Sequence, residues 1–554
     1  MHSKEKNSKT ISRRDFFKGS ALAAVGVAAG GLLAGCGKSK KTEDPAKETK
    51  AGGKAGFEVP PAPIADKDIK KTISADVVVV GAGMSGLCAA LSAAETGAKV
   101  VVLEKRETFS ARGMHIAAIG TKTQEKYGVT INKKQGIRDI IKWSGSRVKQ
   151  ELHWLWANKS GEAMNWLTAM TEAEGYETTL WAAAYKGPDY YEYPGITHTV
   201  LGPSFAKYDN NHDVLAVLEK HAKEKGVNFQ YQTQAAQLVR PDKGRVTAVI
   251  GKNAAGYTKF EAKSGVILCC GDYAADQEMV DRYCPLANKV EAKIYTPVGA
   301  NTGDGHKLGL WAGAAMQKDE PHAAMIHTQA GAWSYCFLHV NKNGERYSNE
   351  DATPQAVCMA KMEQPDRVAW AVYDDRFLDE LPKTVEIGGG MFWDQVARTW
   401  GHPWSRESEE RLLKRHLDAG LVVKADTLDE LAQKMQVPAD KLKATVARYN
   451  ELAKNKEDVD FGKRSELLFP IDKPPFYAGQ FKSALLTIVG GLSINNKMQV
   501  LDQEDNAIPG LYAAGNTAGD FFGNDYPTLF PGHSHGRCIT FGRLAGLNAA
   551  ADKV

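Results

Sequence analysis

The stretch that decides the fold is Asp76-Val77-Val78-Val79-Val80-Gly81-Ala82-Gly83-Met84-Ser85-Gly86. An apolar run that is broken by G-x-G-x-x-G and leads into an Ala-rich segment predicts a buried parallel strand, a tight turn and a helix. Gly81 permits the turn, Gly83 lets the backbone approach a pyrophosphate at the helix N-terminus, and Gly86 lets helix and strand pack closely. The stretch therefore predicts a dinucleotide site.

A second apolar run, residues 100–103, is followed by Glu104 and Lys105. An acid about 20 residues beyond such a turn accepts hydrogen bonds from a ribose diol. A glycine-rich turn alone is a weak signal, because many such turns bind nothing. Here a strand precedes the turn, a helix ending at Gly97 follows it, and the acid stands at the ribose position. This context favours a dinucleotide site over a purely structural turn.

Residues 1–36 are predicted to be a signal peptide. Ser12-Arg13-Arg14-Asp15-Phe16-Phe17-Lys18 is a twin-arginine signature, and the apolar segment behind it is too short to span a membrane. Leu33-Ala34-Gly35-Cys36 resembles the lipoprotein cleavage box, with Cys36 as the lipidated residue; the alternative is an exported protein with a chance cysteine. We expect export by the twin-arginine route and a lipid anchor in the periplasm or on the outer face of the cell membrane.

Residues 37–70 are rich in Lys, Glu, Pro, Gly and Ala, which predicts a flexible linker. The chain has 554 residues and a formal net charge of +4, much of it in the signal and linker. No basic stripe interleaved with aromatic residues follows, which argues against nucleic-acid binding. The eight cysteines form no C-x-x-C pair, so we expect no metal, haem or iron–sulfur site. A redox enzyme of this sequence needs electrons from another protein.

Glycine-rich turns recur later in the chain. Thr302-Gly303-Asp304-Gly305 opens a helix, where backbone N–H groups and the Asp304 carboxylate can bind a nucleotide. A further glycine-rich passage spans residues 510–549, and the region between them is helical and charged. The pattern predicts a nucleotide-binding domain in two parts, residues 71–317 and 470–554, with a second domain, residues 318–469, inserted between them.

In combination, these motifs resemble the fumarate reductase/succinate dehydrogenase flavoprotein family, in its soluble exported branch, and the 3-ketosteroid dehydrogenases. The resemblance covers about residue 72 to the C-terminus. It implies an α/β fold, with a Rossmann-like FAD-binding domain and an inserted α+β capping domain that encloses the substrate. The motifs that carry it are G-A-G-M-S-G (81–86), T-G-D-G (302–305), N-K-N-G-E-R-Y-S-N-E (341–350), T-V-A-R-Y-N (445–450), Gly490-Gly491, G-L-Y-A-A-G (510–515) and T-F-G-R-L-A-G (540–546).

The cofactor that the resemblance implies is FAD. Two departures alter its expected contacts: the family's G-G-x-S loop is replaced by residues 109–114, and the acid of its A-G-E turn by Asn516, whose amide can still bond a ribityl hydroxyl. The residues expected to hold FAD are Gly81, Ala82, Gly83, Ser85, Gly86, Glu104, Lys105, Ser110, Arg112, Gly113, Asp304, Asn516, Ser534 and His535.

The family transfers hydride between flavin N5 and one carbon of an activated C=C bond, and a proton at the neighbouring carbon. In fumarate reductases the resemblance assigns proton donation to an arginine in G-x-R-F-x-N-E, a position that Arg346 occupies. Because the pKa of arginine lies far above neutrality, it can only relay a proton, with Glu350 in the relay. The alternative for Arg346 is a structural or carboxylate-orienting role.

Departures from the fumarate pattern concern the substrate. Thr487 stands where fumarate reductases have a substrate-binding His, and Leu529 stands where they have an Arg. Each lost charge-assisted bond costs about 1.5–3 kcal/mol, so fumarate is not the expected substrate. Thr487, His327 and His533 are candidate substrate contacts; of His533 and His535, at least one imidazole is expected to line the pocket.

The loop that contains Leu529 is rich in aromatic residues, which suggests a larger, less charged substrate; the alternative is that these residues only pack the loop against the cap. Tyr526-Pro527 is similar to the Y-P of 3-ketosteroid dehydrogenases. This resemblance makes Tyr526 a candidate catalytic residue that donates a hydrogen bond to the group activating the C=C bond.

We thus expect an exported FAD-dependent reductase of a C=C bond conjugated to a carbonyl or carboxyl group. Such an enzyme would act as a terminal reductase in anaerobic respiration, with a cytochrome c or a membrane quinol-linked cytochrome as electron donor. The alternatives are a 3-ketosteroid-type dehydrogenase and a lipoprotein that binds flavin or ligand without turnover.

Overall fold

The central element of the fold is β1 (Ile69–Val80), which carries the valine run of the predicted strand. A computed structural model describes residues 55–110, 115–181, 193–202, 210–294, 299–329, 336–387 and 405–553. In it, β1 lies inside an eight-stranded sheet of order β17-β18-β9-β1-β2-β6, to which β8 and β7 are added antiparallel from β9. The other strands are β2 (Val100–Leu103), β6 (Asn228–Gln230), β7 (Gln234–Val239), β8 (Ala248–Asn253), β9 (Gly256–Leu268), β17 (Gln499–Leu501) and β18 (Ala507–Ala513).

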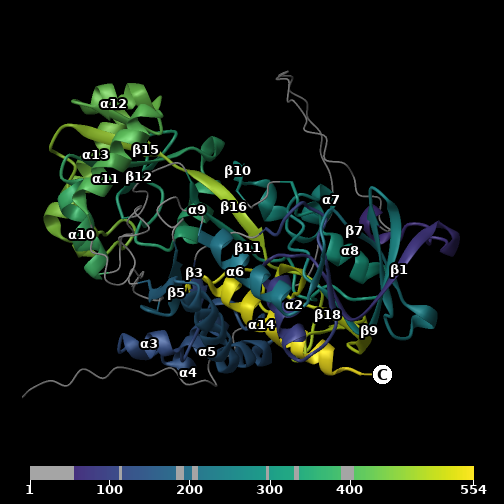
Figure 1. The fold of residues 1–554 in the computed structure, drawn as a ribbon. Coiled ribbons are helices and arrows are strands. Elements are labelled where there is room, and N and C mark those ends of the chain that lie inside the picture. Colours follow the sequence, from purple (N-terminus) through teal and green to yellow (C-terminus); the bar gives the residue numbers. More distant parts are fainter. Residues whose placement is uncertain are drawn as a thin grey trace, which may run out of the picture. The chain divides into compact units, whose positions relative to one another are not determined.

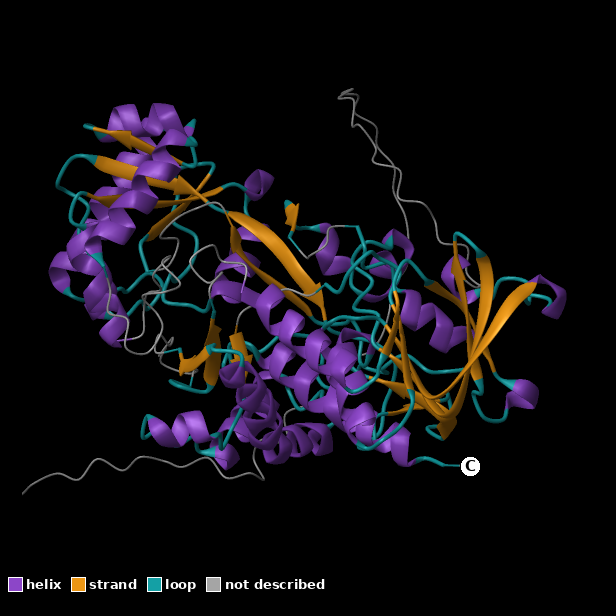
Figure 2. Cartoon of the chain, viewed as in Figure 1, coloured by secondary structure: helices purple, strands orange, loops and turns teal. Residues whose placement is uncertain are grey.

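Five neighbouring strands of this sheet, β18, β9, β1, β2 and β6, run parallel. The side chains of residues 77–80 and 100–103 are buried, as expected for parallel strands covered on both faces. Figure 2 shows the twist of these strands. Their carboxyl ends lie on one edge, which is where such sheets bind ligands.

Helices α2 (Met84–Glu95) and α14 (His533–Ala551) pack against each other beside this sheet (Figure 1). The contact requires glycine: a Cβ at Gly546 would lie 2.2 Å from the carbonyl oxygen of Ala89. The other helices of this part are α3 (Lys122–Lys126), α4 (Lys133–Trp143), α5 (Gln150–Ala173), α6 (Asn210–Glu224), α7 (Gln277–Tyr283) and α8 (Asp304–Trp311).

Two three-stranded sheets accompany the large one. Their orders are β10-β16-β11 and β3-β5-β4. The strands are β3 (His115–Ala117), β4 (Glu177–Leu180), β5 (Thr197–Leu201), β10 (Ala292–Lys293), β11 (Ala324–Gln329) and β16 (Lys482–Ile488).

The inserted region contains a four-stranded antiparallel sheet of order β12-β13-β15-β14 with its own hydrophobic core. Helices α11 and α12 contact β14, and α13 packs on α12 (Figure 1). The elements are β12 (Leu338–Asn341), β13 (Ala369–Asp374), β14 (Val422–Ala425), β15 (Phe476–Gln480), α9 (Pro354–Met362), α10 (Phe377–Ile387), α11 (Arg406–Asp418), α12 (Leu428–Met435) and α13 (Ala439–Asn455). The architecture is the predicted Rossmann-like domain with an inserted α+β cap.

Two predicted boundaries need correction. Strand β15 pairs with β13 and β14, so the cap extends past residue 469 to about residue 480. Part of the predicted linker is anchored on the large domain: Phe57 is buried, and the Gly56 N–H donates to the Glu278 carboxylate at 2.7 Å, whereas most of residues 58–70 are exposed. The composition of this segment predicted a linker because it is rich in Lys, Glu, Pro, Gly and Ala, but the single aromatic residue Phe57 anchors it. The signal peptide, Cys36, Arg112 and Gly113 lie outside the described residues.

Within the described ranges, no helix is long and apolar enough to span a membrane. The same residues contain no cluster of His, Cys, Asp or Glu suited to a metal ion.

Candidate active site

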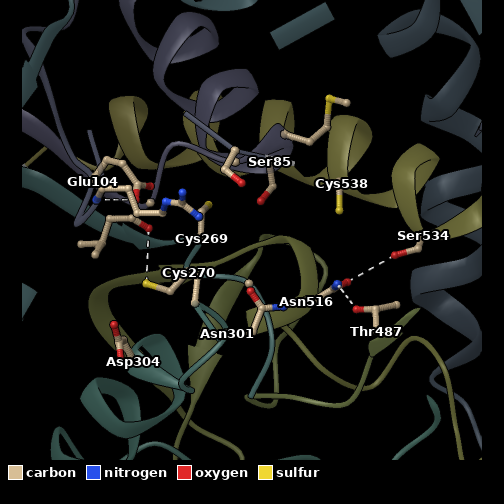
Figure 3. Close-up of a pocket in the computed structure, with 18 of the residues that line it drawn as sticks. Ser85, Glu104, Cys269, Cys270, Asn301, Asp304, Thr487, Asn516, Ser534 and Cys538 are labelled. Atoms are coloured by element: carbon tan, nitrogen blue, oxygen red, sulfur yellow. Dashed lines mark hydrogen bonds between the residues drawn. The ribbon is translucent and has the colours of Figure 1, made fainter. Parts of the chain in front are cut away.

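A groove runs along the carboxyl edge of the parallel strands. It collects residues that follow β1, β2, β9 and β18 and residues at the starts of α2, α8 and α14 (Figure 3). Of the predicted site residues, it is lined by Gly81, Gly83, Ser85, Glu104, Lys105, Ser110, Asp304, Thr487, Asn516, Tyr526, Ser534 and His535. Tertiary structure thus unites three glycine-rich motifs that lie more than 200 residues apart.

The first glycine turn has the geometry that its sequence predicted. Gly81 has a φ of +103°, which disfavours any side chain. A Cβ at Gly86 would lie 1.9 Å from the carbonyl oxygen of Gly81, so this position admits only glycine. Gly83 caps α2 without a side chain, which leaves the helix N-terminus open to an anion.

Glu104 organises the end of the groove next to this turn. Its carboxylate accepts hydrogen bonds from the N–H groups of Ala82 (2.9 Å) and Arg106 (3.0 Å). A carboxylate has about four acceptor positions, so two remain for a ribose diol. Ala82 itself is buried and reaches the site only through its N–H.

Lys105 and Asp304 connect two distant parts of the groove wall. The Lys105 ammonium lies 3.0 Å from the Asp304 carboxylate at the start of α8 and donates to the Thr302 hydroxyl at 2.9 Å. Both residues are partly exposed, so the pair contributes little stability. It fixes the positions of two loops that line the groove.

The opposite end of the groove has a chain of hydrogen bonds in its wall. Thr487 donates its hydroxyl proton to Asp272 at 2.6 Å and accepts from the Asn516 amide at 2.7 Å. The Asn516 amide oxygen accepts from the Ser534 hydroxyl at 3.2 Å (Figure 3) and from Arg537 at 2.6 Å. Burial raises the pKa of Asp272 above its ordinary value.

This chain corrects the prediction for Thr487. Its only hydroxyl proton is donated to Asp272, so the side chain has no donor to offer a substrate carboxylate or carbonyl. Leu529, at the family's Arg position, is 1% exposed. His327, in β11, is not part of the groove wall, and its Nδ1 contacts the Thr328 carbonyl oxygen at 2.8 Å.

Tyr526 is the aromatic residue of its loop that lines the groove. Its phenolic oxygen accepts the N–H of Ser534 at 3.1 Å, which leaves the phenolic proton available to donate. Burial raises the pKa of Tyr526 to about 12, so the phenol stays protonated near neutral pH. His535 also lines the groove, and its Nδ1 lies 2.9 Å from the His115 carbonyl oxygen.

His533 does not line the groove. Its imidazole is fully buried in an aromatic cluster, with ring centroids 4.3 Å from Trp156 and 4.9 Å from Phe521. Burial lowers its pKa well below the ordinary value. Phe522 and Phe530 belong to the same cluster, so most of the loop's aromatic residues form core. The alternative that these residues pack the loop therefore fits Phe521, Phe522 and Phe530, which contact rings in α5 and α14. Tyr526 also packs, with its ring centroid 4.9 Å from that of Phe522, but it lines the groove as well.

Arg346 lies in the cap, outside the groove wall, between two carboxylates. It donates twice to Glu350 (2.9 and 2.8 Å) and twice to Asp458 (3.0 and 2.7 Å). Burial alone lowers the pKa of Arg346, but these bonds outweigh it and raise the pKa above its ordinary value. An arginine held this way is a poor proton donor. The geometry favours the structural role over the predicted donor role, and Glu350 shares that role.

Some groove residues were not predicted. Asn301, Met325, Cys269, Cys270 and Cys538 line the groove, and Asp272 and Arg537 support it from behind. Cys269 and Cys270 directly follow the buried run at the end of β9, just as Glu104 directly follows β2. This position after a parallel strand could have identified both cysteines as groove residues from the sequence.

The groove fits a dinucleotide that carries a flavin. The open N-terminus of α2 suits a pyrophosphate, Glu104 suits the ribose beside it, and the polar wall around Asn516 suits a ribityl chain and ring edge. Fold and groove together define an FAD-dependent oxidoreductase.

The chain belongs to the family described as FAD binding domain, which matches residues 76–527. A vinyl phenol reductase of Lactiplantibacillus plantarum is 27% identical, over 87% of this chain and 97% of that protein. A fumarate reductase (cytochrome) of Shewanella frigidimarina is 27% identical, over 86% of this chain and 77% of that protein.

Among solved structures, a 3-ketosteroid-Δ4-(5α)-dehydrogenase from Rhodococcus jostii superposes with a TM-score of 0.66. It is 22% identical, over 89% of this chain and 99% of that one, which supports the fold. The predicted family resemblance and the FAD cofactor are thus confirmed.

Proposed function

We propose that this protein reduces a C=C bond conjugated to a carbonyl or carboxyl group, and that its substrate carries at most one negative charge. One observation carries the proposal: at the substrate end of the groove, the Tyr526 phenol accepts the Ser534 N–H and keeps its own proton for donation to a substrate. Leu529 is apolar and Thr487 donates its proton to Asp272, so neither offers a ligand for a second carboxylate. Similarity to reductases of vinyl phenols and fumarate supports C=C reduction as the reaction class.

Bound FAD supplies the hydride in this chemistry. The residues of the chain position the substrate and hold protons. Tyr526 donates a hydrogen bond to the activating oxygen, where negative charge develops as the C=C bond accepts hydride. Solvent then supplies the proton that the neighbouring carbon gains. The Ser534 N–H at the start of α14 fixes the phenol. In this proposal, Arg346 and Glu350 stabilise the cap through their buried ion pair.

The test measures oxidation of reduced methyl viologen by the purified FAD-loaded protein under anaerobic conditions. We expect turnover with a cinnamate or an enone, and kcat/KM for fumarate lower by roughly 100-fold or more, because two charge-assisted bonds are missing. Fumarate as the preferred acceptor would contradict the proposal. The variant Tyr526→Phe should keep FAD but reduce kcat with every acceptor by about 100-fold.

A ketosteroid-type dehydrogenase is the second candidate, favoured by the same Tyr526 geometry. A saturated 3-ketosteroid with an artificial electron acceptor distinguishes the two, since faster turnover in that direction favours the dehydrogenase. Protein that binds FAD but is inactive in both assays would instead fit a non-catalytic flavin-binding lipoprotein.

We further propose that the protein is exported by the twin-arginine route, anchored by a lipid on Cys36, and reduced by a separate cytochrome during anaerobic respiration. The twin-arginine signature and the Leu33-Ala34-Gly35-Cys36 box support this. Detergent phase partitioning of cell extracts tests the anchor: Cys36→Ala should move the protein from the detergent phase to the aqueous phase. An unchanged partition would exclude lipidation of Cys36.

A further inference from the structure

Arg537 is a buried cation beside the FAD groove. It is 1% exposed, on the first turns of α14, and its guanidinium donates to the Asn516 amide oxygen at 2.6 Å and to the Ala518 carbonyl oxygen at 3.3 Å. Its charged carbon lies 4.9 Å from the ring centre of Phe522. Within the described part of the chain, no carboxylate is among the partners of Arg537.

A charge buried in this way is costly, because neutral acceptors and an aromatic face replace only part of its hydration. Consistent with this cost, burial lowers the pKa of Arg537 below its ordinary value. Two other buried cations that the structure describes each have a carboxylate partner: Lys463 lies 3.3 Å from Glu350, and Lys361 lies 2.5 Å from Glu291. Arg537 therefore lacks the compensation that this chain provides elsewhere.

The Arg537 charge acts on the groove through Asn516. Arg537 donates to Asn516, Asn516 to Thr487, and Thr487 to Asp272, so every bond of the chain is oriented in the same direction. Asn516, Thr487 and Ser534 line the groove at the end opposite Glu104 (Figure 3). The ribose of the AMP half belongs beside Glu104, so the flavin ring belongs at the Asn516 end.

We propose that Arg537 raises the reduction potential of the bound FAD. The reduced flavin ring at neutral pH carries a negative charge that the oxidised ring lacks, so a fixed cation nearby stabilises the reduced form selectively. The low-dielectric surroundings of Arg537 weaken this interaction less than water would. Arg537 is not part of the groove wall and reaches the groove only through Asn516, so its effect on bound FAD is indirect. The inference rests on FAD binding and is independent of which alkene is reduced.

The test measures the midpoint potential of FAD in the purified full-length protein, by equilibration with a reference dye. Arg537→Gln removes the charge and should disfavour reduced FAD at least tenfold, a fall of about 30 mV for a two-electron couple. Arg537→Lys keeps the charge and should stay near the wild-type potential. Arg543→Gln is the matched control on the same helix, because Arg543 is paired with Glu95 outside the groove.

An FAD-loaded Arg537→Gln protein with the wild-type potential overturns the proposal. Should this variant fail to fold or to hold FAD, Arg537→Lys decides the question: a fall of about 30 mV or more in this cationic variant overturns the proposal, and an unchanged potential supports it. Because a potential is measured without substrate, failure here is distinct from failure of the proposed reaction.

Discussion

Replacing Arg346 tests whether this residue is structural or catalytic. Arg346 and Lys463 form a buried cluster with Glu350 and Asp458, in which two positive charges balance two negative charges. All four side chains are at most 7% exposed. Arg346→Met removes one positive charge and leaves the cluster with a net charge of −1 inside the cap.

The expected cost is about 3–5 kcal/mol, the usual penalty for removing one partner of a buried ion pair. The double variant Arg346→Met/Asp458→Asn restores neutrality, because Glu350 and Lys463 remain as a balanced pair. It should recover about 1–3 kcal/mol, the cost of leaving a buried polar or charged group unsatisfied. The double variant is therefore expected to be more stable than the single one.

Large multidomain chains rarely unfold in one step, so hydrogen exchange of peptides from β12 and β13 is the suitable assay. A loss of 3–5 kcal/mol should speed their exchange by roughly 100-fold to several thousand-fold. Arg448→Met is the control: Arg448 lies on α13 of the same cap, is 43% exposed in its pair with Asp460, and should change the stability by less than about 1 kcal/mol.

Two results would refute this reasoning. One is a double variant that exchanges as fast as Arg346→Met or faster. The other is an Arg346→Met protein with wild-type exchange but no turnover, which would restore the proton-donor role.

Three further predictions follow from the site. Tyr526→Phe should reduce kcat by about 100-fold, the loss typical of removing one donor to a developing oxyanion, while the visible absorbance of bound FAD persists. Gly86→Ala should yield protein without that absorbance, because its Cβ would lie 1.9 Å from a backbone oxygen; normal FAD content would contradict the close packing. Three buried histidines should contribute a constant amount to the free energy of unfolding above about pH 6.5, and this contribution should fall by up to ~1.4 kcal/mol per pH unit per histidine between about pH 6.5 and 4.5. The reason is that burial lowers their pKa values to about 4, whereas they protonate in the unfolded chain near 6.5; melting temperatures measured between these two pH values would show no such fall if the three groups titrated normally. These histidines are His153, His198 and His306.

The FAD end of the site could be predicted from the sequence, because the residues that form it lie close together in the chain. A parallel strand, a positive-φ turn and an uncapped helix are all encoded within residues 76–95, and the acid that completes them directly follows the next strand. Close packing allows only glycine at such positions: a Cβ at Gly86 would lie 1.9 Å from the Gly81 carbonyl oxygen. The required glycines therefore form a motif that can be recognised in the sequence.

The substrate end of the site was harder to predict from the sequence, since residue type alone does not show whether a side chain points into a groove or into a core. His533 and His535 differ by two positions on one helix, yet one is buried among aromatic rings and the other lines the groove. Thr487 does line the groove, but its donor proton is committed to Asp272, a partner 215 positions away. The same limit applies to Arg346, whose second carboxylate, Asp458, comes from a distant loop.

The sequence by itself therefore determined the fold class, the family and the cofactor, because glycine turns and apolar periodicity act over a few residues. Only the tertiary structure decided which polar side chains remain available for chemistry. A side chain is available only if its donor protons and its charge are not already engaged by another group of the protein. The engaging groups come from distant segments of the chain: Asp272 for Thr487, Asp458 for Arg346, and Asn516 for Arg537. The valine strand and its glycine turn anchor the cofactor, while these long-range partnerships determine how the chain can use it.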